Sequence, residues 1–67
     1  MLKISLNGVE RHIDPATSVA TLLAENGYAQ RKIAVEVNRE IVPKSTHAQR
    51  LLHDGDRVEI VQALGGG

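Results

Sequence analysis

The stretch DGDRVEIVQALGGG, residues 54–67, decides the fold. Its first three residues favour a tight turn, because aspartate side chains bond to nearby backbone and glycine accepts unusual dihedral angles. From Arg57 to about Leu64, polar and apolar residues alternate closely enough to predict a strand with one buried face. Val58 and Ile60 are expected to face the core. The residues expected to face away from it are Glu59, Val61 and Ala63.

Three glycines, Gly65, Gly66 and Gly67, follow this strand directly. Without Cβ atoms they form a thin segment that can enter a slot closed to larger residues and make strand-like hydrogen bonds there. Their reach beyond the strand is at most about 10 Å, from the span of extended residues. We therefore predict a tail that inserts into a partner protein. The alternatives are a frayed terminus and a cloning scar.

The beginning of the chain predicts a β-hairpin. Residues 2–6 alternate between apolar and polar types, as a strand with one buried face does. Asn7-Gly8 is a strong hairpin signal because both residues tolerate positive φ. The return strand should cover residues 9–13. We expect it at a sheet edge, where the long charged side chain of Arg11 discourages further pairing.

One helix of about ten residues is predicted between Asp14-Pro15 and Asn26-Gly27. Thr17 or Ser18 can cap its N-terminus, and Asn26-Gly27 supplies the left-handed stop. Its apolar residues recur at helical spacing and form a single stripe, which fits a helix lying on a sheet. These residues are Val19, Leu22 and Leu23.

The second half of the chain predicts another strand pair and a buried turn. Residues 33–37 alternate as a strand, Asn38-Arg39 can reverse the chain, and residues 40–42 form a short strand that Pro43 ends. Residues 45–52 are expected to form a helical turn. The side chains that this turn would place against the core are Leu51 and Leu52.

This order of elements predicts a two-layer α+β domain, with a mixed sheet of four or five strands packed on one main helix. The first and last strands should lie side by side in the centre of the sheet, and the face away from the helix should be open. Residues 1–64 would form the domain, and residues 65–67 would form a flexible tail.

Bulk composition argues against several functional classes. A chain of 67 residues has a small core and little room for a catalytic pocket, so we expect no enzyme. Eight basic residues balance eight acidic ones and Tyr28 is the only aromatic residue, whereas nucleic-acid binders usually carry a basic stripe or stacking platforms. No apolar run approaches the roughly 20 residues of a membrane span, and we expect no secretory signal because residues 1–8 lack an apolar h-region. We expect a cytoplasmic protein without nucleic-acid or membrane partners.

The side chains form no recognisable catalytic or metal-binding constellation. The chain lacks cysteine, which excludes disulfides and thiolate metal sites. His12, His47 and His53 do not have the i, i+4 spacing of a helical zinc site. Asp54-Gly55-Asp56 lacks the further ligands and the terminal glutamate of a calcium loop. No glycine-rich phosphate loop precedes the helix, so we expect no bound cofactor.

Taken together, these segments resemble the ThiS family of sulfur carriers in thiamine thiazole synthesis, which have a ubiquitin-like β-grasp fold. The family typically shows N-x-x-x-V-P-[RK], then L-x-D-G-D with an Ile/Val-rich last strand, and ends on Gly-Gly. Two departures stand out, since His47 replaces a frequent aromatic residue and Gly65 replaces a larger one. The residues that match the pattern are Asn38, Val42, Pro43, Lys44, Leu52, Asp54, Gly55, Asp56, Val58, Ile60, Val61, Gly66 and Gly67.

The resemblance implies that a ThiF-type enzyme adenylates Gly67 with Mg-ATP. A persulfide from a cysteine desulfurase would convert it to a thiocarboxylate, and a ThiG-type thiazole synthase would accept the sulfur. The glycines 65–67 would enter the partners, next to a contact surface on the open sheet face. Alternatives are the small subunit of molybdopterin synthase and a ubiquitin-like interaction module. The expected contact surface consists of Val61, Ala63 and Leu64.

Overall fold

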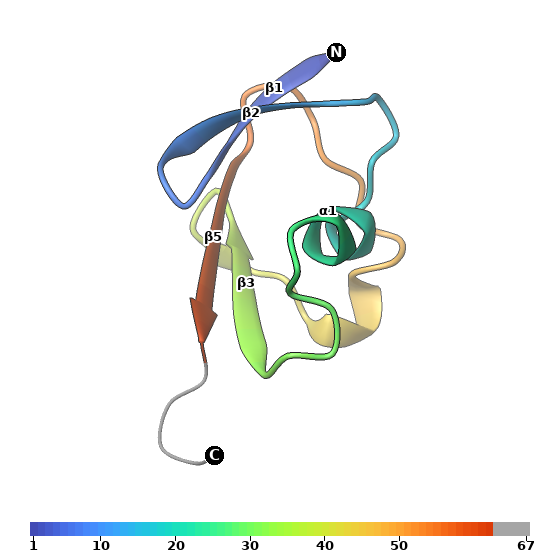
Figure 1. The fold of residues 1–67 in the computed structure, drawn as a ribbon, viewed down its shortest axis with the longest axis vertical. Coiled ribbons are helices and arrows are strands. Elements are labelled where there is room, and N and C mark those ends of the chain that lie inside the picture. Colours follow the sequence, from blue (N-terminus) through green and yellow to red (C-terminus); the bar gives the residue numbers. More distant parts are fainter. Residues whose placement is uncertain (63–67) are drawn as a thin grey trace.

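The computed structural model describes residues 1–62. Strands and helices follow one another in the predicted order (Figure 1). The elements are β1 (Leu2–Leu6), β2 (Val9–Ile13), α1 (Val19–Glu25), β3 (Ile33–Val37), β4 (Glu40–Ile41), a 3₁₀ helix (Lys44–Thr46) and β5 (Arg57–Gln62).

The strands form one mixed sheet of five, in the order β2-β1-β5-β3-β4. β1 and β5 are parallel, with Ser5 opposite Arg57 and Leu6 opposite Val58, and the other neighbours are antiparallel. The prediction that the first and last strands pair inside the sheet is confirmed. The edge position of the Arg11-bearing strand β2 is confirmed as well.

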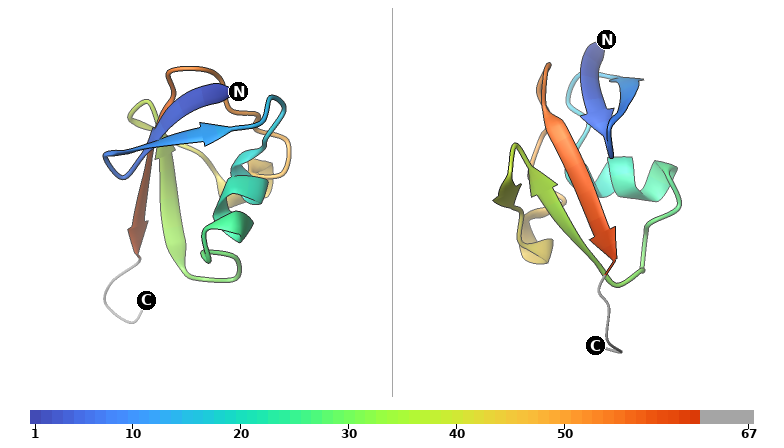
Figure 2. Two further views of the ribbon diagram at one scale, coloured as in Figure 1. Left: turned by 45° about the horizontal axis from the view of Figure 1, so that its top comes forward. Right: turned by 90° about the vertical axis from the view of Figure 1, so that its left-hand side faces the viewer.

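Helix α1 covers one face of this sheet, and β3 and β5 present their other face outward (Figure 2). Ser18 caps the helix, because its hydroxyl accepts a hydrogen bond of 3.1 Å from the Thr21 amide. The two layers enclose a core of aliphatic side chains. The core consists of Ile4, Leu6, Ile13, Val19, Leu22, Leu23, Val35, Val37, Val42, Leu52 and Val58.

The helix is shorter than predicted, at 7 residues. The difference lies at its N-terminus, because the helix begins only after the Ser18 cap. It ends where the sequence predicts, and the Tyr28 amide donates to the Leu23 carbonyl at 2.8 Å, a bond of the Schellman cap. Gly27 follows with φ +81°, the left-handed stop expected from the sequence.

Both predicted hairpin turns have the geometry of the class expected for them. Asn7 and Gly8 have φ of 51° and 82°, and Asn38 and Arg39 have φ of 52° and 71°. Positive φ at both central residues is the pattern of type I′ hairpin turns, whose twist matches that of the strands. Asn7-Gly8 joins β1 to β2, and Asn38-Arg39 joins β3 to β4.

The prediction for residues 45–52 is half wrong. Leu52 is buried, but Leu51 is exposed. After the 3₁₀ helix and its following turns, the chain extends beside the start of α1, with the Leu52 amide donating to the Thr17 carbonyl at 2.9 Å and the Arg50 carbonyl accepting from the Val19 amide at 2.8 Å. Neighbouring side chains of an extended segment point to opposite sides, so only one of the two leucines reaches the core.

Strand β5 follows the predicted alternation, since Val58 is buried, Ile60 packs on the core and Val61 is exposed. The predicted extension of the strand to Leu64 and the boundary between domain and tail lie outside the described residues. Within residues 1–62, no helix has the length and apolar character needed to cross a bilayer.

Candidate functional site

The start of β5 is fixed by a carboxylate. Asp56 is 8% exposed, and its Oδ2 accepts from the His53 amide at 2.8 Å while its Oδ1 accepts from Asn38 Nδ2 at 2.9 Å. Asn38 Oδ1 in turn accepts from the Arg57 amide at 2.9 Å. Charge-assisted hydrogen bonds of this length are strong. They lock the turn before β5 to the turn between β3 and β4.

The two residues before Asp56 connect the same turn to β1. Asp54 Oδ1 accepts from the Lys3 amide at 2.7 Å, and the Gly55 amide donates to the Lys3 carbonyl at 2.7 Å. Gly55 has φ +87°, a conformation strained for residues with a Cβ. The D-G-D segment therefore fixes the position of β5 relative to β1 and to the turn between β3 and β4. Within residues 1–62, no group of three or more acidic or histidine side chains is placed to hold a metal ion.

The end of β5 is held from both sides. On one side Asn7 Oδ1 accepts from the Ile60 amide at 2.7 Å, which extends the contact with the first hairpin beyond the last paired residue of β1. On the other side β3 pairs along the whole strand, up to Ile33 opposite Gln62. The chain therefore continues toward its glycines from a rigid base (Figure 1).

An apolar patch lies beside this base on the open face of the sheet, and we define it as Ala34, Ile41 and Val61. Val61 is 53% exposed and pairs with Ala34 across the ladder. Ile41 is 64% exposed and lies opposite Glu36, one same-face step along β3 from Ala34. Strand alternation alone placed Val61 on this face. Ala34 and Ile41 could be assigned to the patch only from the register between the strands, which the sequence does not reveal.

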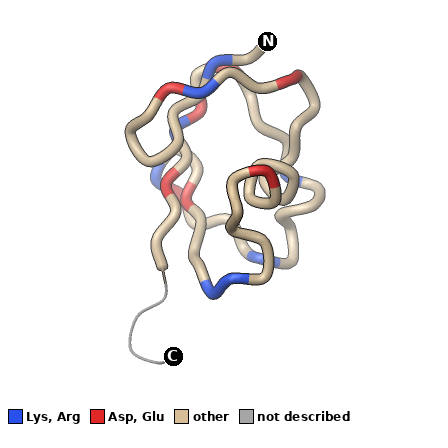
Figure 3. The backbone as a smooth tube through the Cα atoms, in the orientation of Figure 1, with Lys and Arg blue, Asp and Glu red and all other residues tan. Residues whose placement is uncertain are grey.

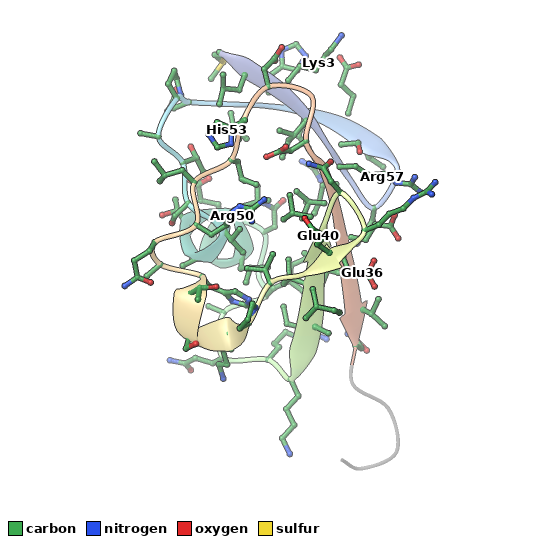
Figure 4. All side chains as sticks on the ribbon, turned by 180° about the vertical axis from the view of Figure 1, so that it is seen from behind. Lys3, Glu36, Glu40, Arg50, His53 and Arg57 are labelled. Carbon is green, nitrogen blue, oxygen red and sulfur yellow. The ribbon has the colours of Figure 1, made fainter. Side chains whose placement is uncertain are left out.

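The open face is acidic next to the apolar patch. Glu36 and Glu59 lie directly opposite each other on β3 and β5, where Figure 3 shows red segments on neighbouring strands. Arg57 Nε lies 2.8 Å from Glu59 Oε1, and Figure 4 labels Glu36 and Arg57 in this region. Like charges opposite each other in a ladder are unfavourable, and the Arg57 pair offsets part of this repulsion.

His47, which departs from the family pattern, has a structural position. Its side chain is buried at the edge of the core, and its Nε2 lies 3.0 Å from the Val42 carbonyl oxygen. Because a carbonyl can only accept, Nε2 carries the hydrogen. The His47 carbonyl accepts from the Ala20 amide at 3.0 Å. The residue thus joins the 3₁₀ segment to helix α1.

Of the predicted site residues, the described part of the chain contains Val61, which lies exposed on the open face as expected. Its role toward a partner stays a prediction. The other predicted site residues lie outside the described residues. They are Ala63, Leu64, Gly65, Gly66 and Gly67.

Comparison with known proteins identifies close relatives of this domain. Residues 4–67 match the model of the ThiS family. The chain is 50% identical over 66 residues to a protein named thiazole synthase from Paramagnetospirillum magneticum, and 29% identical over 66 residues to the sulfur carrier protein ThiS of Escherichia coli. Both alignments cover 98% of this chain. They cover 20% of the first relative and 100% of the second, so the chain spans about a fifth of the thiazole synthase.

A solved structure extends the likeness to three dimensions. The crystal structure of the thiamine biosynthesis protein ThiS from Geobacter metallireducens matches with a TM-score of 0.85 at 29% identity. The match covers 98% of this chain and 100% of that one. The predicted ubiquitin-like β-grasp fold is therefore confirmed.

Proposed function

Because this chain belongs to the ThiS family of sulfur carriers in thiamine biosynthesis, we propose that its Gly67 is adenylated, converted to a thiocarboxylate and used to donate sulfur to the thiazole ring. The observation that carries the proposal is the rigid end of β5, from which the glycine segment continues. The chain itself acts as a recyclable substrate, comparable to a group-carrying cofactor.

Each chemical step follows from the weak reactivity of a carboxylate. A terminal carboxylate resists nucleophiles because of its charge, so one of its oxygens first attacks the α-phosphorus of ATP and displaces pyrophosphate. The terminal sulfur of a persulfide then attacks the acyl carbon and expels AMP. A thiol cleaves the resulting acyl disulfide, which releases the thiocarboxylate and leaves a disulfide. No side chain of this protein takes part.

The rigid base supports this function through conformational entropy. Ordering one backbone residue costs about 1–2 kcal/mol. Since β5 is already paired up to Gln62, a partner that takes the tail does not have to order the strand that precedes it. Glycines 65–67 add no side chains to the tail, so the partner's channel can be narrow.

The names of the relatives support a thiazole synthase as the acceptor of the sulfur. In the relative from Paramagnetospirillum magneticum, a region like this chain belongs to a protein of that name. We assign adenylation to a ThiF-type enzyme that uses Mg-ATP, and sulfur delivery to a cysteine desulfurase system. The thiazole synthase name favours this pathway over molybdopterin synthesis. We place these reactions in the cytoplasm and assign no catalysis to the chain.

The apolar patch is the proposed docking surface for the adenylating enzyme. Ala34, Ile41 and Val61 are exposed near the base of the tail, where a protein that receives the glycines can make contact. Ala63 and Leu64 would extend this surface toward the channel. Interface cores are typically apolar with a polar rim, and the neighbouring Glu36 and Glu59 would supply part of that rim.

Intact mass spectrometry tests the function. The chain is incubated with a ThiF-type enzyme, Mg-ATP and a persulfide source, and we expect a mass gain of one sulfur-for-oxygen exchange. A variant without Gly66 and Gly67 is the control, and its mass should not change in the same mixture. The proposal fails if the mass of the intact chain does not change while the Escherichia coli ThiS protein gains sulfur in the same mixture. The proposal also requires that Gly67 carries the terminal carboxylate, which the mass of protein isolated from its own cells checks.

A further inference from the structure

A pocket of about 260 Å³ opens on the helix side of the molecule. It lies between α1, the loop that leads into β3 and the 3₁₀ segment, three parts that Figure 1 shows next to one another. Leu23, Tyr28 and Ile33 provide an apolar lining. The imidazole of His47 borders the same pocket, and its Nε2–H is already bonded to the Val42 carbonyl. The interior is therefore suited to an apolar group.

The ionised residues that line this pocket are both cationic. Arg31 and Lys44 are exposed on its border, and no aspartate or glutamate lines it. Figure 3 shows blue on the loop before β3 and on the 3₁₀ segment. The Arg31 guanidinium carbon lies 5.8 Å from the centroid of the Tyr28 ring, a cation–π distance that holds the charge over the lining. Neither cation forms an ion pair with a carboxylate of residues 1–62.

The size of the pocket is compatible with a large apolar side chain as its occupant. At about 260 Å³ this pocket lies near the lower end of the range for small-molecule sites, about 300–1,000 Å³. A cavity of about 150 Å³ already accepts benzene. The volume therefore fits one large apolar side chain of a protein partner. The two flanking cations fit acidic residues beside that side chain.

The pocket lies at the end of the molecule from which the glycine segment continues. Ile33 lines it and pairs with Gln62, the last described residue of β5. The apolar patch occupies the opposite face of the sheet at the same end, because Ala34 follows Ile33 and strand neighbours point to opposite sides. A partner that receives the tail can thus contact both faces.

We propose that this pocket docks one large apolar side chain of the thiazole synthase, and that aspartate or glutamate residues flanking that side chain pair with Arg31 and Lys44. The inference rests on the proposed function, since it takes the acceptor of the sulfur as the partner. Contact on the helix side would leave the apolar patch to the adenylating enzyme. The two partners would then recognise different faces around one shared tail.

A fluorine label on Tyr28 tests whether the pocket is filled. The chain has a single tyrosine, so growth on 3-fluorotyrosine gives one ¹⁹F resonance that comes from the pocket. Adding purified ThiG-type thiazole synthase should shift this resonance. If the synthase binds, as measured by calorimetry, and the resonance does not move, the docking inference is wrong while the sulfur-carrier function stands. If the synthase does not bind and the chain gains no sulfur, both proposals fall.

Charge reversal tests the acidic flank. The variant with Arg31→Glu and Lys44→Glu should bind the synthase about tenfold more weakly at about 0.1 M salt, and the loss should shrink near 1 M, where the screening length falls to about 3 Å. Lys3→Glu with Arg11→Glu is the matched control, because it changes the net charge equally on β1 and β2. This control should lose less than about threefold. If both variants lose the same affinity for the synthase, the effect is long-range electrostatic attraction, and the proposal that the pocket docks the synthase is wrong.

A third variant blocks the pocket without changing its charge. Ala48 is exposed and lines the pocket from the 3₁₀ side. Ala48→Leu should occupy part of the volume and weaken synthase binding, with the thermal unfolding curve unchanged. Full affinity of Ala48→Leu together with full affinity of the Arg31 and Lys44 variant would reject the pocket as a docking site.

Discussion

Val58 and Val61 stand on the same strand and face opposite sides of the sheet. Val58 is 0% exposed under helix α1, whereas Val61 is 53% exposed on the open face. The helix-covered face holds the core together, and the open face provides the surface that a partner can recognise. Because the strand alternates, stability and recognition are assigned to different residues of one short segment. Substitutions on the two faces should therefore have separable effects.

The largest loss of stability is expected on the helix-covered face. Leu22→Ala removes a side chain that is 2% exposed and should lower the free energy of unfolding by about 3 kcal/mol. The matched change Ile41→Ala, on the open face, should cost less than about 0.5 kcal/mol. Urea denaturation of both variants measures the difference. Similar losses would mean that the open face is packed against something in the folded protein.

The two valines of β5 give the closest match in chemistry. Val58→Ala deletes two methyl groups worth about 0.8 kcal/mol each and leaves a small cavity, so we expect a loss of about 2 kcal/mol. Val61→Ala should change stability by less than about 0.5 kcal/mol. Thermal unfolding of the pair checks the values. A large loss for Val61→Ala would contradict its assignment as a surface residue.

A charge on the apolar patch should affect binding rather than folding. Val61→Asp places a carboxylate in the proposed docking surface, and binding to the ThiF-type enzyme should weaken about tenfold. Thr21→Asp is the control, since it adds the same charge near the N-terminus of α1, where acidic residues are tolerated. Calorimetric titration of both variants with the ThiF-type enzyme should show weaker binding for Val61→Asp and wild-type binding for Thr21→Asp. Equal binding of Val61→Asp and the wild type would remove Val61 from the interface.

The smallest effect concerns a pH-dependent contact on the open face near the sheet edge. Glu10 accepts a hydrogen bond of 2.9 Å from His12, and this contact, with help from Lys3, lowers the pKa of Glu10 below its ordinary value of 4.5. A carboxylate with a lowered pKa stabilises the folded state above its ordinary value, and this contribution disappears as the pH falls through the lowered value. Melting temperatures of wild type and Glu10→Gln should differ slightly near neutral pH and converge in acid. A pH-independent difference would contradict this assignment.

Local chemistry made much of the fold predictable. Asn7, Gly8 and Asn38 tolerate positive φ, so both hairpins could be read from the sequence, although Arg39 adopts φ of 71° against its preference. The buried stripe of α1 and the faces of β5 followed from periodicity. The start of the helix after Ser18 and the exposure of Leu51 could not be fixed from the sequence, because both depend on the extended contact between residues 50–52 and residues 17–19.

The candidate site was only partly readable for the same reason. Val61 required strand alternation alone, whereas Ala34 and Ile41 join it through pairing between strands distant in sequence. The pocket bordered by Arg31 and Lys44 depends on how the 3₁₀ segment packs beside α1, and no periodicity encodes that contact. Gly65, Gly66 and Gly67 were singled out by residue type, independently of any tertiary structure.

The parallel pairing of β1 with β5 has a mechanical consequence. Leu2 begins β1 and Gln62 ends β5, so tension applied between these residues runs along both strands in opposite directions. The hydrogen bonds between the strands, and the Asn7 contact with Ile60, are then loaded in shear and resist together instead of unzipping one after another. The domain can therefore transmit a pull on its tail without losing the end of β5.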